Sequence, residues 1–95
     1  MISAKEAVNA AAAYMLDLYA GATGLRVEEI ELDDDQGLWI VTMGFWETVP
    51  VPPSLNSLAA IALNPKVQRV YKELRIRTSD GQVVSMKIRN LPSAE

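Results

Sequence analysis

The chain has 95 residues, of which 49% are hydrophobic and 22% are charged. This composition is typical of a globular domain with one hydrophobic core, and we expect residues 1–95 to form a single domain. The chain contains no cysteine and no histidine, which excludes disulfides, thiolate zinc sites and the usual neutral-pH proton carriers. We therefore expect a non-enzymatic protein without a cofactor or a metal site.

Charge is distributed unevenly along the chain, although the formal net charge is only −3. Residues 1–48 hold two basic and nine acidic side chains, whereas residues 49–95 hold seven basic and three acidic ones. A negative net charge disfavours non-specific binding to nucleic acid. No apolar run approaches the roughly 20 residues that span a bilayer, and no signal-peptide pattern is present. We expect a cytoplasmic protein that does not enter a membrane.

A first helix is predicted for residues 4–20. Ser3 and Glu6 have the spacing of a capping box, in which each side chain accepts a hydrogen bond from the backbone of the other. Gly21 supplies a C-terminal stop. Apolar residues recur at helical spacing between these signals, and the predicted buried stripe consists of Ala4, Val8, Ala11, Ala12, Met15, Leu18 and Tyr19.

Two strands are predicted next, at about residues 25–33 and 38–46, because apolar residues begin to alternate with polar ones. A slip in this alternation at Glu28-Glu29 indicates a β-bulge in the first strand. The second strand is apolar on both faces, so we expect both faces to be covered. One face carries Trp39, Val41, Met43 and Phe45, and the other carries Leu38, Ile40 and Trp46.

A three-residue loop, residues 35–37, is predicted to join these two strands. Gly37 then has the left-handed conformation that follows a type I turn in such loops. The resulting register sets Leu32 opposite Ile40 and Val27 opposite Phe45.

Residues 47–67 are predicted to leave the sheet, because a proline cannot donate to a central ladder and this segment contains Pro50, Pro52 and Pro53. Ser54 is predicted to cap a short helix that ends at Asn64-Pro65. We expect this segment to cover the second face of the strand at 38–46. The alternative cover is a partner or a second copy of the chain.

The last hairpin is predicted from strands at about 68–78 and 82–89, joined by the loop Ser79-Asp80-Gly81. Its register sets Ile76 opposite Val84, Leu74 opposite Met86 and Glu73 opposite Lys87. The order of elements predicts an α+β fold, in which the N-terminal helix packs on a four-stranded antiparallel meander.

The stretch from Tyr71 to Met86 combines an aromatic-containing strand, an acidic residue, a glycine turn and a strand that opens with paired aliphatic residues. With the preceding helix and strands, over residues 4–20 and 25–89, it resembles the PepSY-like, broadly cystatin-like small bacterial domains. The resemblance implies a binding or inhibitory module and no catalytic residue. Many such domains lie in the cell envelope, whereas this chain has no export-signal pattern and carries an additional proline-rich segment.

The predicted function is protein–protein interaction, as a small adaptor, regulatory or immunity-type protein that binds a protein partner or a second copy of itself as a homodimer. Aromatic side chains and arginine dominate the binding energy of protein interfaces. The predicted partner-binding residues are Trp39, Phe45, Trp46, Pro50, Pro52, Pro53, Tyr71, Arg75 and Arg77.

An alternative function is a small-ligand or nucleic-acid binding module that uses the basic face of the last hairpin. Four basic side chains alternate onto this face beside Tyr71: Arg75, Arg77, Lys87 and Arg89. A nucleic-acid platform normally combines such charges with several exposed aromatic residues, so we regard protein binding as the leading interpretation.

Overall fold

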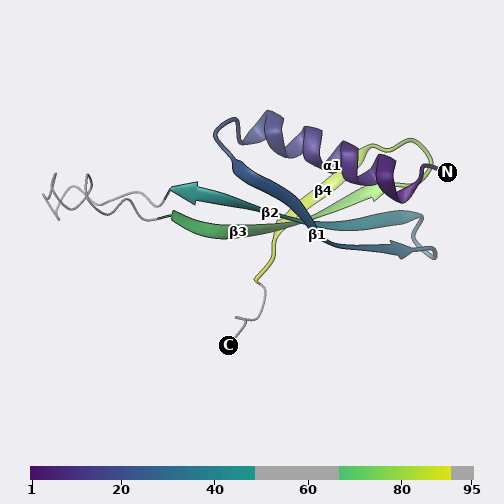
Figure 1. Cartoon of the computed structure of the whole chain (residues 1–95). Helices are drawn as coiled ribbons and strands as arrows, with labels where there is room; N and C mark the ends of the chain where they lie inside the picture. Colours follow the sequence, from purple (N-terminus) through teal and green to yellow (C-terminus); the bar gives the residue numbers. More distant parts are fainter. Residues whose placement is uncertain (49–66, 91–95) are drawn as a thin grey trace, which may run out of the picture.

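The computed structural model describes residues 1–48 and 67–90, which form the predicted α+β fold (Figure 1). The elements are α1 (Ala4–Leu18), β1 (Thr23–Asp33), β2 (Leu38–Thr48), β3 (Val67–Arg77) and β4 (Val83–Ile88). The strands form an antiparallel sheet in the order β1-β2-β3-β4, and α1 lies across one face of it. Within the described ranges, no helix is long and apolar enough to cross a membrane.

Helix α1 begins at the predicted capping box. The Ser3 hydroxyl accepts a hydrogen bond from the Glu6 backbone N–H at 3.1 Å, and the Glu6 carboxylate accepts one from the Ser3 N–H at 3.0 Å. The helix ends at Leu18 rather than at residue 20, because Tyr19 leaves the helical conformation. The Tyr19 N–H still donates to the carbonyl oxygen of Met15 and so closes the last turn.

The hydrophobic core lies between α1 and the middle of the sheet. Ala7, Ala11 and Met15 are fully buried, and their small or flexible side chains allow the helix to approach the strands closely. Ala7 is buried although it was not part of the predicted stripe, and Leu18 is 50% exposed although it was part of it. The buried face of the helix is therefore rotated from the predicted one. The sheet contributes Val41, Met43, Phe45, Leu74 and Ile76.

The β1–β2 hairpin has a four-residue loop, residues 34–37, instead of the predicted three-residue loop. The carboxylate of Asp33 accepts a hydrogen bond from the Gln36 N–H at 3.2 Å and stabilises this longer turn. Gly37 has the predicted left-handed conformation, with φ of 66°. The longer loop shifts the register by one residue, so Leu32 lies opposite Trp39 rather than Ile40. The register shift between Val27 and Glu29 adds a second residue, so Val27 lies opposite Met43 rather than Phe45.

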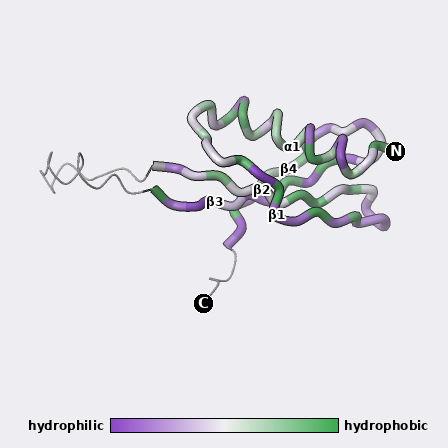
Figure 2. Tube along the Cα trace, viewed as in Figure 1, coloured by the Kyte–Doolittle hydropathy of each residue, from purple (hydrophilic) through white to green (hydrophobic). Residues whose placement is uncertain are grey.

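The predicted bulge in β1 is confirmed by a register shift between Val27 and Glu29. Figure 2 shows hydrophobic and hydrophilic residues alternating along β1, as expected for a strand with two different faces.

The β3–β4 hairpin also contains a bulge, which the sequence did not indicate. The predicted pairs Leu74–Met86 and Glu73–Lys87 are confirmed. Ile76, however, lies opposite Val83 rather than Val84, because β4 accommodates one extra residue at this point. The displaced Val84 side chain is 48% exposed.

The segment predicted to leave the sheet at 47–67 is shorter than expected, because β2 continues to Thr48 and β3 begins at Val67. Its remaining part, residues 49–66, lies outside the described residues. This part includes the predicted short helix and Pro50, Pro52 and Pro53.

Candidate functional site

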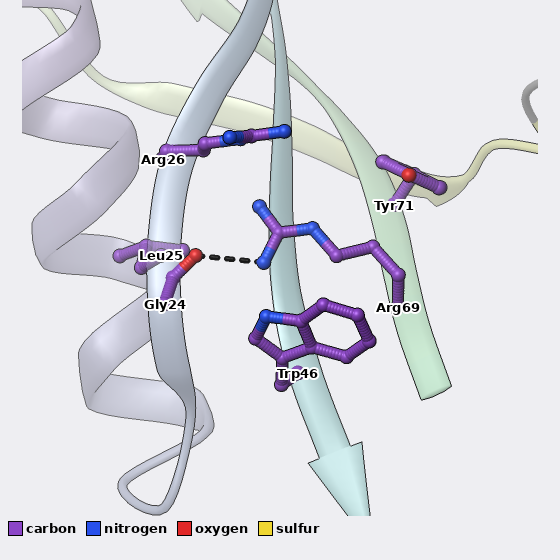
Figure 3. A pocket seen from close by; sticks show the side chains of 6 residues that line it. All are labelled: Gly24, Leu25, Arg26, Trp46, Arg69 and Tyr71. Carbon is purple, nitrogen blue, oxygen red and sulfur yellow. Dashed lines mark hydrogen bonds between the residues drawn. The ribbon is translucent and has the colours of Figure 1, made fainter. Parts of the chain in front are cut away.

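The candidate site lies on the outer face of the sheet, the face opposite α1. Phe45 points into the core, so its neighbour Trp46 in β2 points to the outer face. The β2–β3 register places Arg69 opposite Trp46. An open hollow of about 600 Å³ is found here (Figure 3), and it is lined by Gly24, Leu25, Arg26, Trp46, Arg69 and Tyr71.

Arg69 organises this hollow by connecting β3 to β1 across β2. One terminal nitrogen donates to the carbonyl oxygen of Gly24 at 2.8 Å, and the other donates to the carboxylate of Glu28 at 3.0 Å. The guanidinium carbon lies 5.4 Å from the centre of the Trp46 ring (Figure 3). The charge-assisted hydrogen bond to Glu28 positions the guanidinium group, and the cation–π contact then favours this orientation of the indole.

Glu28 is the acidic centre of the same cluster. Its carboxylate also accepts a hydrogen bond from Nε of Arg26 at 3.0 Å. The hydrogen bonds from Arg26 and then Arg69 lower the pKa of Glu28 below its ordinary value. The Glu28 side chain is only 17% exposed, and it therefore keeps a paired negative charge beneath the hollow.

Gly44 provides the space in which this ion pair lies against the sheet. A β-carbon at this position would be 2.6 Å from Oε2 of Glu28 and 3.0 Å from Nη2 of Arg69. Only glycine lets both charged groups approach the β2 backbone so closely.

A second ion pair covers the outer face next to this cluster. Arg89, which follows β4, donates to the Thr42 hydroxyl at 2.6 Å and forms a salt bridge with Glu29 of β1. Thr42 is only 1% exposed as a result. The predicted burial of both faces of β2 therefore holds at Thr42 and Gly44, where the outer cover consists of long charged side chains from neighbouring strands.

Two predicted partner-binding residues, Trp46 and Tyr71, line the hollow on either side of Arg69 (Figure 3), and Trp46 is 44% exposed. Two others lie on the helix-facing side. Phe45 is 2% exposed and stacks on Tyr19 with ring centres 5.2 Å apart. Trp39 is half-buried there, and its indole N–H donates to the carbonyl oxygen of Ile2 at 3.1 Å. Neither side chain belongs to the outer-face site.

The remaining predicted residues do not reach the hollow. Arg75 and Arg77 are on the outer face, but the register puts them toward the opposite end of β3 from Arg69. Arg75 forms a salt bridge with Glu73 at 3.0 Å, and Arg77 forms one with Asp80 at 2.6 Å. The three predicted prolines lie outside the described residues.

Sequence reasoning missed Arg69, Glu28, Arg26 and Gly24. The alternation of β3 places Arg69 on the same face as Tyr71. This shared face is the one feature of the sequence that indicates a role for Arg69 in the site. The contact with Glu28 depends on the β2–β3 register, and no turn motif in the intervening sequence fixes that register.

Comparison of the chain with protein-family models, with curated proteins and with solved structures gave no match. The resemblance to PepSY-like domains therefore stays a prediction from the sequence.

Proposed function

We propose that the protein is a non-catalytic protein–protein interaction module and that Trp46, Arg69 and Tyr71 form the centre of its binding surface. The observation that carries this proposal is the convergence of these three side chains in one open hollow. Tryptophan, arginine and tyrosine are the residue types most enriched among the side chains that dominate binding energy. Within this proposal, the protein acts as a cytoplasmic adaptor, regulatory or immunity-type protein.

The chemistry of the hollow supports binding rather than catalysis. Its charged groups, Arg26 and Arg69, are guanidinium groups, which donate hydrogen bonds and have no acceptor atom. Both are held by Glu28, and Arg69 is only 13% exposed. An aromatic ring that is already fixed loses little conformational freedom when a partner covers it, and such preorganisation favours affinity.

The alternative, an anionic ligand on the last hairpin, is less well supported. Arg75, Arg77 and Arg89 each form a salt bridge with an acidic side chain of the same chain. A phosphate or a nucleic-acid backbone would have to compete with these carboxylates.

The test is affinity capture from cells of the source organism with immobilised wild-type protein and matched variants. We expect Trp46→Ala to weaken the captured complex by about 2 kcal/mol or more, which is roughly 30-fold. Tyr14→Ala is the matched control, because Tyr14 is a 38% exposed aromatic residue on α1. Equal capture by wild type and Trp46→Ala would overturn the proposal.

The double variant Arg75→Ala, Arg77→Ala separates the two functions. On a protein-binding surface, these peripheral charges should mainly slow association at low salt. Loss of binding at high salt in this variant, with no effect of Trp46→Ala, would instead favour an anionic ligand.

A further inference from the structure

Strands β1 and β4 are the two edges of the sheet, because the strand order is β1-β2-β3-β4. Each pairs with one neighbour, and no described strand covers its other side. A free edge presents unpaired backbone donors and acceptors that can add a further strand.

On each edge strand, five consecutive residues pair with the neighbouring strand without a bulge. Pairing of β1 with β2 runs without interruption from Glu29 to Asp33, after the bulge. Pairing of β4 with β3 is regular from Ser85 to Ile88, and the Arg89 N–H continues it by donating to the carbonyl oxygen of Tyr71 at 3.0 Å. The two stretches, 29–33 and 85–89, have the same length.

The two edges carry opposite charges on the outer face and apolar side chains on the helix-facing side. In β1, Glu29 and Glu31 are on the outer face, while Ile30 and Leu32 are 37% and 39% exposed on the other side. In β4, Lys87 is on the outer face, and Ile88 on the helix-facing side is 73% exposed.

The directions of β1 and β4 also allow these two edges to pair. In a four-stranded antiparallel meander, β1 and β4 run in opposite directions. A second copy placed beside the first in the same orientation therefore brings β4 antiparallel to β1, and both helices then lie on the same side of the continuous sheet.

We propose that copies of this chain associate head to tail, with β1 of one copy and β4 of the next paired so that Glu31 lies opposite Lys87. In this register, outer-face pairs combine acidic with basic or hydroxyl groups, and helix-facing pairs are apolar. The pairs are Glu29–Arg89, Ile30–Ile88, Glu31–Lys87, Leu32–Met86 and Asp33–Ser85.

Other arrangements fit less well. A shift by one residue sets charged side chains against apolar ones, and a shift by two shortens the regular pairing. Two-fold pairing of β1 with itself about Ile30 sets Glu29 against Glu31 of the other copy, and like charges directly opposite each other destabilise a sheet. Head-to-tail contacts are open-ended unless the rotation between copies closes a ring.

The Glu31–Lys87 pair gives the clearest test of the proposed pairing between β1 and β4. Within one chain, Arg89 already forms a salt bridge with Glu29. Association would replace this salt bridge with the same pair between two copies, so the number of ion pairs would not increase. In the described part of the chain, neither Glu31 nor Lys87 lies in a salt bridge. The proposal uses neither Trp46 nor Arg69 and does not rest on the proposed function.

The experiment measures average mass against protein concentration by light scattering and sedimentation, at low and high salt. The wild type should increase in mass with concentration, and high salt should reduce this increase. Glu31→Lys and Lys87→Glu should each weaken association roughly tenfold, because each sets like charges opposite one another. An equimolar mixture of the two variants should associate again, since every contact between unlike copies is then complementary.

The control is Asp17→Lys, which reverses an exposed charge on α1 and should associate like the wild type. Circular dichroism checks that each variant keeps the fold. A wild type that stays monomeric at all concentrations, or a mixture that associates no better than its components, overturns the proposal.

A crosslinking measurement tests the register independently. The chain has no cysteine, so Ile30→Cys and Ile88→Cys can be introduced in separate copies and mixed under mild oxidation. These two positions should form an intermolecular disulfide faster than Ile30→Cys with Val84→Cys, because residue 84 is outside the proposed ladder. Equal rates would contradict the register.

Discussion

Gly44 lies beneath the ion pair between Arg69 and Glu28, and both charged groups occupy the space that a side chain at this position would fill. The contact is important because Arg69 also supports the Trp46 ring. One small residue in the middle of β2 thus determines whether the hollow keeps its shape.

We therefore expect Gly44→Ala to destabilise the protein by about 1–3 kcal/mol, the usual range for an oversized side chain in a packed site. Displacement of Arg69 should also alter the fluorescence of Trp46. Chemical unfolding followed by tryptophan emission measures both effects. Gly21→Ala is the control, because a β-carbon there meets nothing within 4 Å. Equal stability of the two variants would show that the ion pair can move at little cost.

The lowered pKa of Glu28 predicts how stability depends on pH. Because the folded-state pKa lies below the unfolded value of about 4.3, the stabilisation is present above that value and is lost as the pH falls through the folded pKa. Glu28→Gln should be less stable than wild type at pH 7, and the difference should shrink on acidification below about pH 4. Unfolding midpoints at a series of pH values test this.

Glu47→Gln changes an exposed glutamate at the end of β2 and serves as the control. A stability difference between wild type and Glu28→Gln that stays constant from neutral to acid pH would contradict the assigned role of Glu28.

At the scale of elements, α1 depends on local signals. The Ser3–Glu6 capping box satisfies two backbone N–H groups at the helix start. Ser3→Ala should cost about 1 kcal/mol and lower the melting temperature by roughly 4–8 °C. Ser3→Asn, which keeps an acceptor at the cap, should retain most of the stability. An unchanged melting temperature for the double variant Ser3→Ala, Glu6→Ala would show that the cap contributes nothing.

Local signals also explain which elements the sequence could predict. The capping box fixed the start of α1, and Gly37 was recognisable as a left-handed turn residue. The registers were less predictable, because they depend on details that alternation does not reveal. The Asp33 side chain stabilises a longer loop, and the bulge at Val84 changes the pairing near the last turn.

The candidate site was predictable only in part for a similar reason. The lack of apolar–polar alternation showed that β2 has two apolar faces, but it did not show which face α1 covers. Phe45 was therefore assigned to the binding surface together with Trp46. Arg69 and Glu28 are 41 positions apart, and their contact follows only from the tertiary pairing of β1, β2 and β3.

For the molecule as a whole, the uneven charge of the sequence becomes an arrangement of ion pairs across the sheet. Acidic residues of β1 face the outer side, and arginines from β3 and the end of β4 reach across β2 to meet them. These long side chains cover the centre of β2 and leave the aromatic ring of Trp46 partly exposed beside them. On the outer face, paired charged side chains therefore surround the aromatic ring of Trp46.

The central claim is that a protein partner covers Trp46 on this face, and quenching of tryptophan fluorescence tests it most directly. The chain has two tryptophans, so Trp39→Phe leaves Trp46 as the sole reporter. With the captured partner added, acrylamide should quench Trp46 less than in the free protein, because its 44% exposed side chain becomes buried. Unchanged quenching in a complex whose formation is established by its mass would contradict the claim.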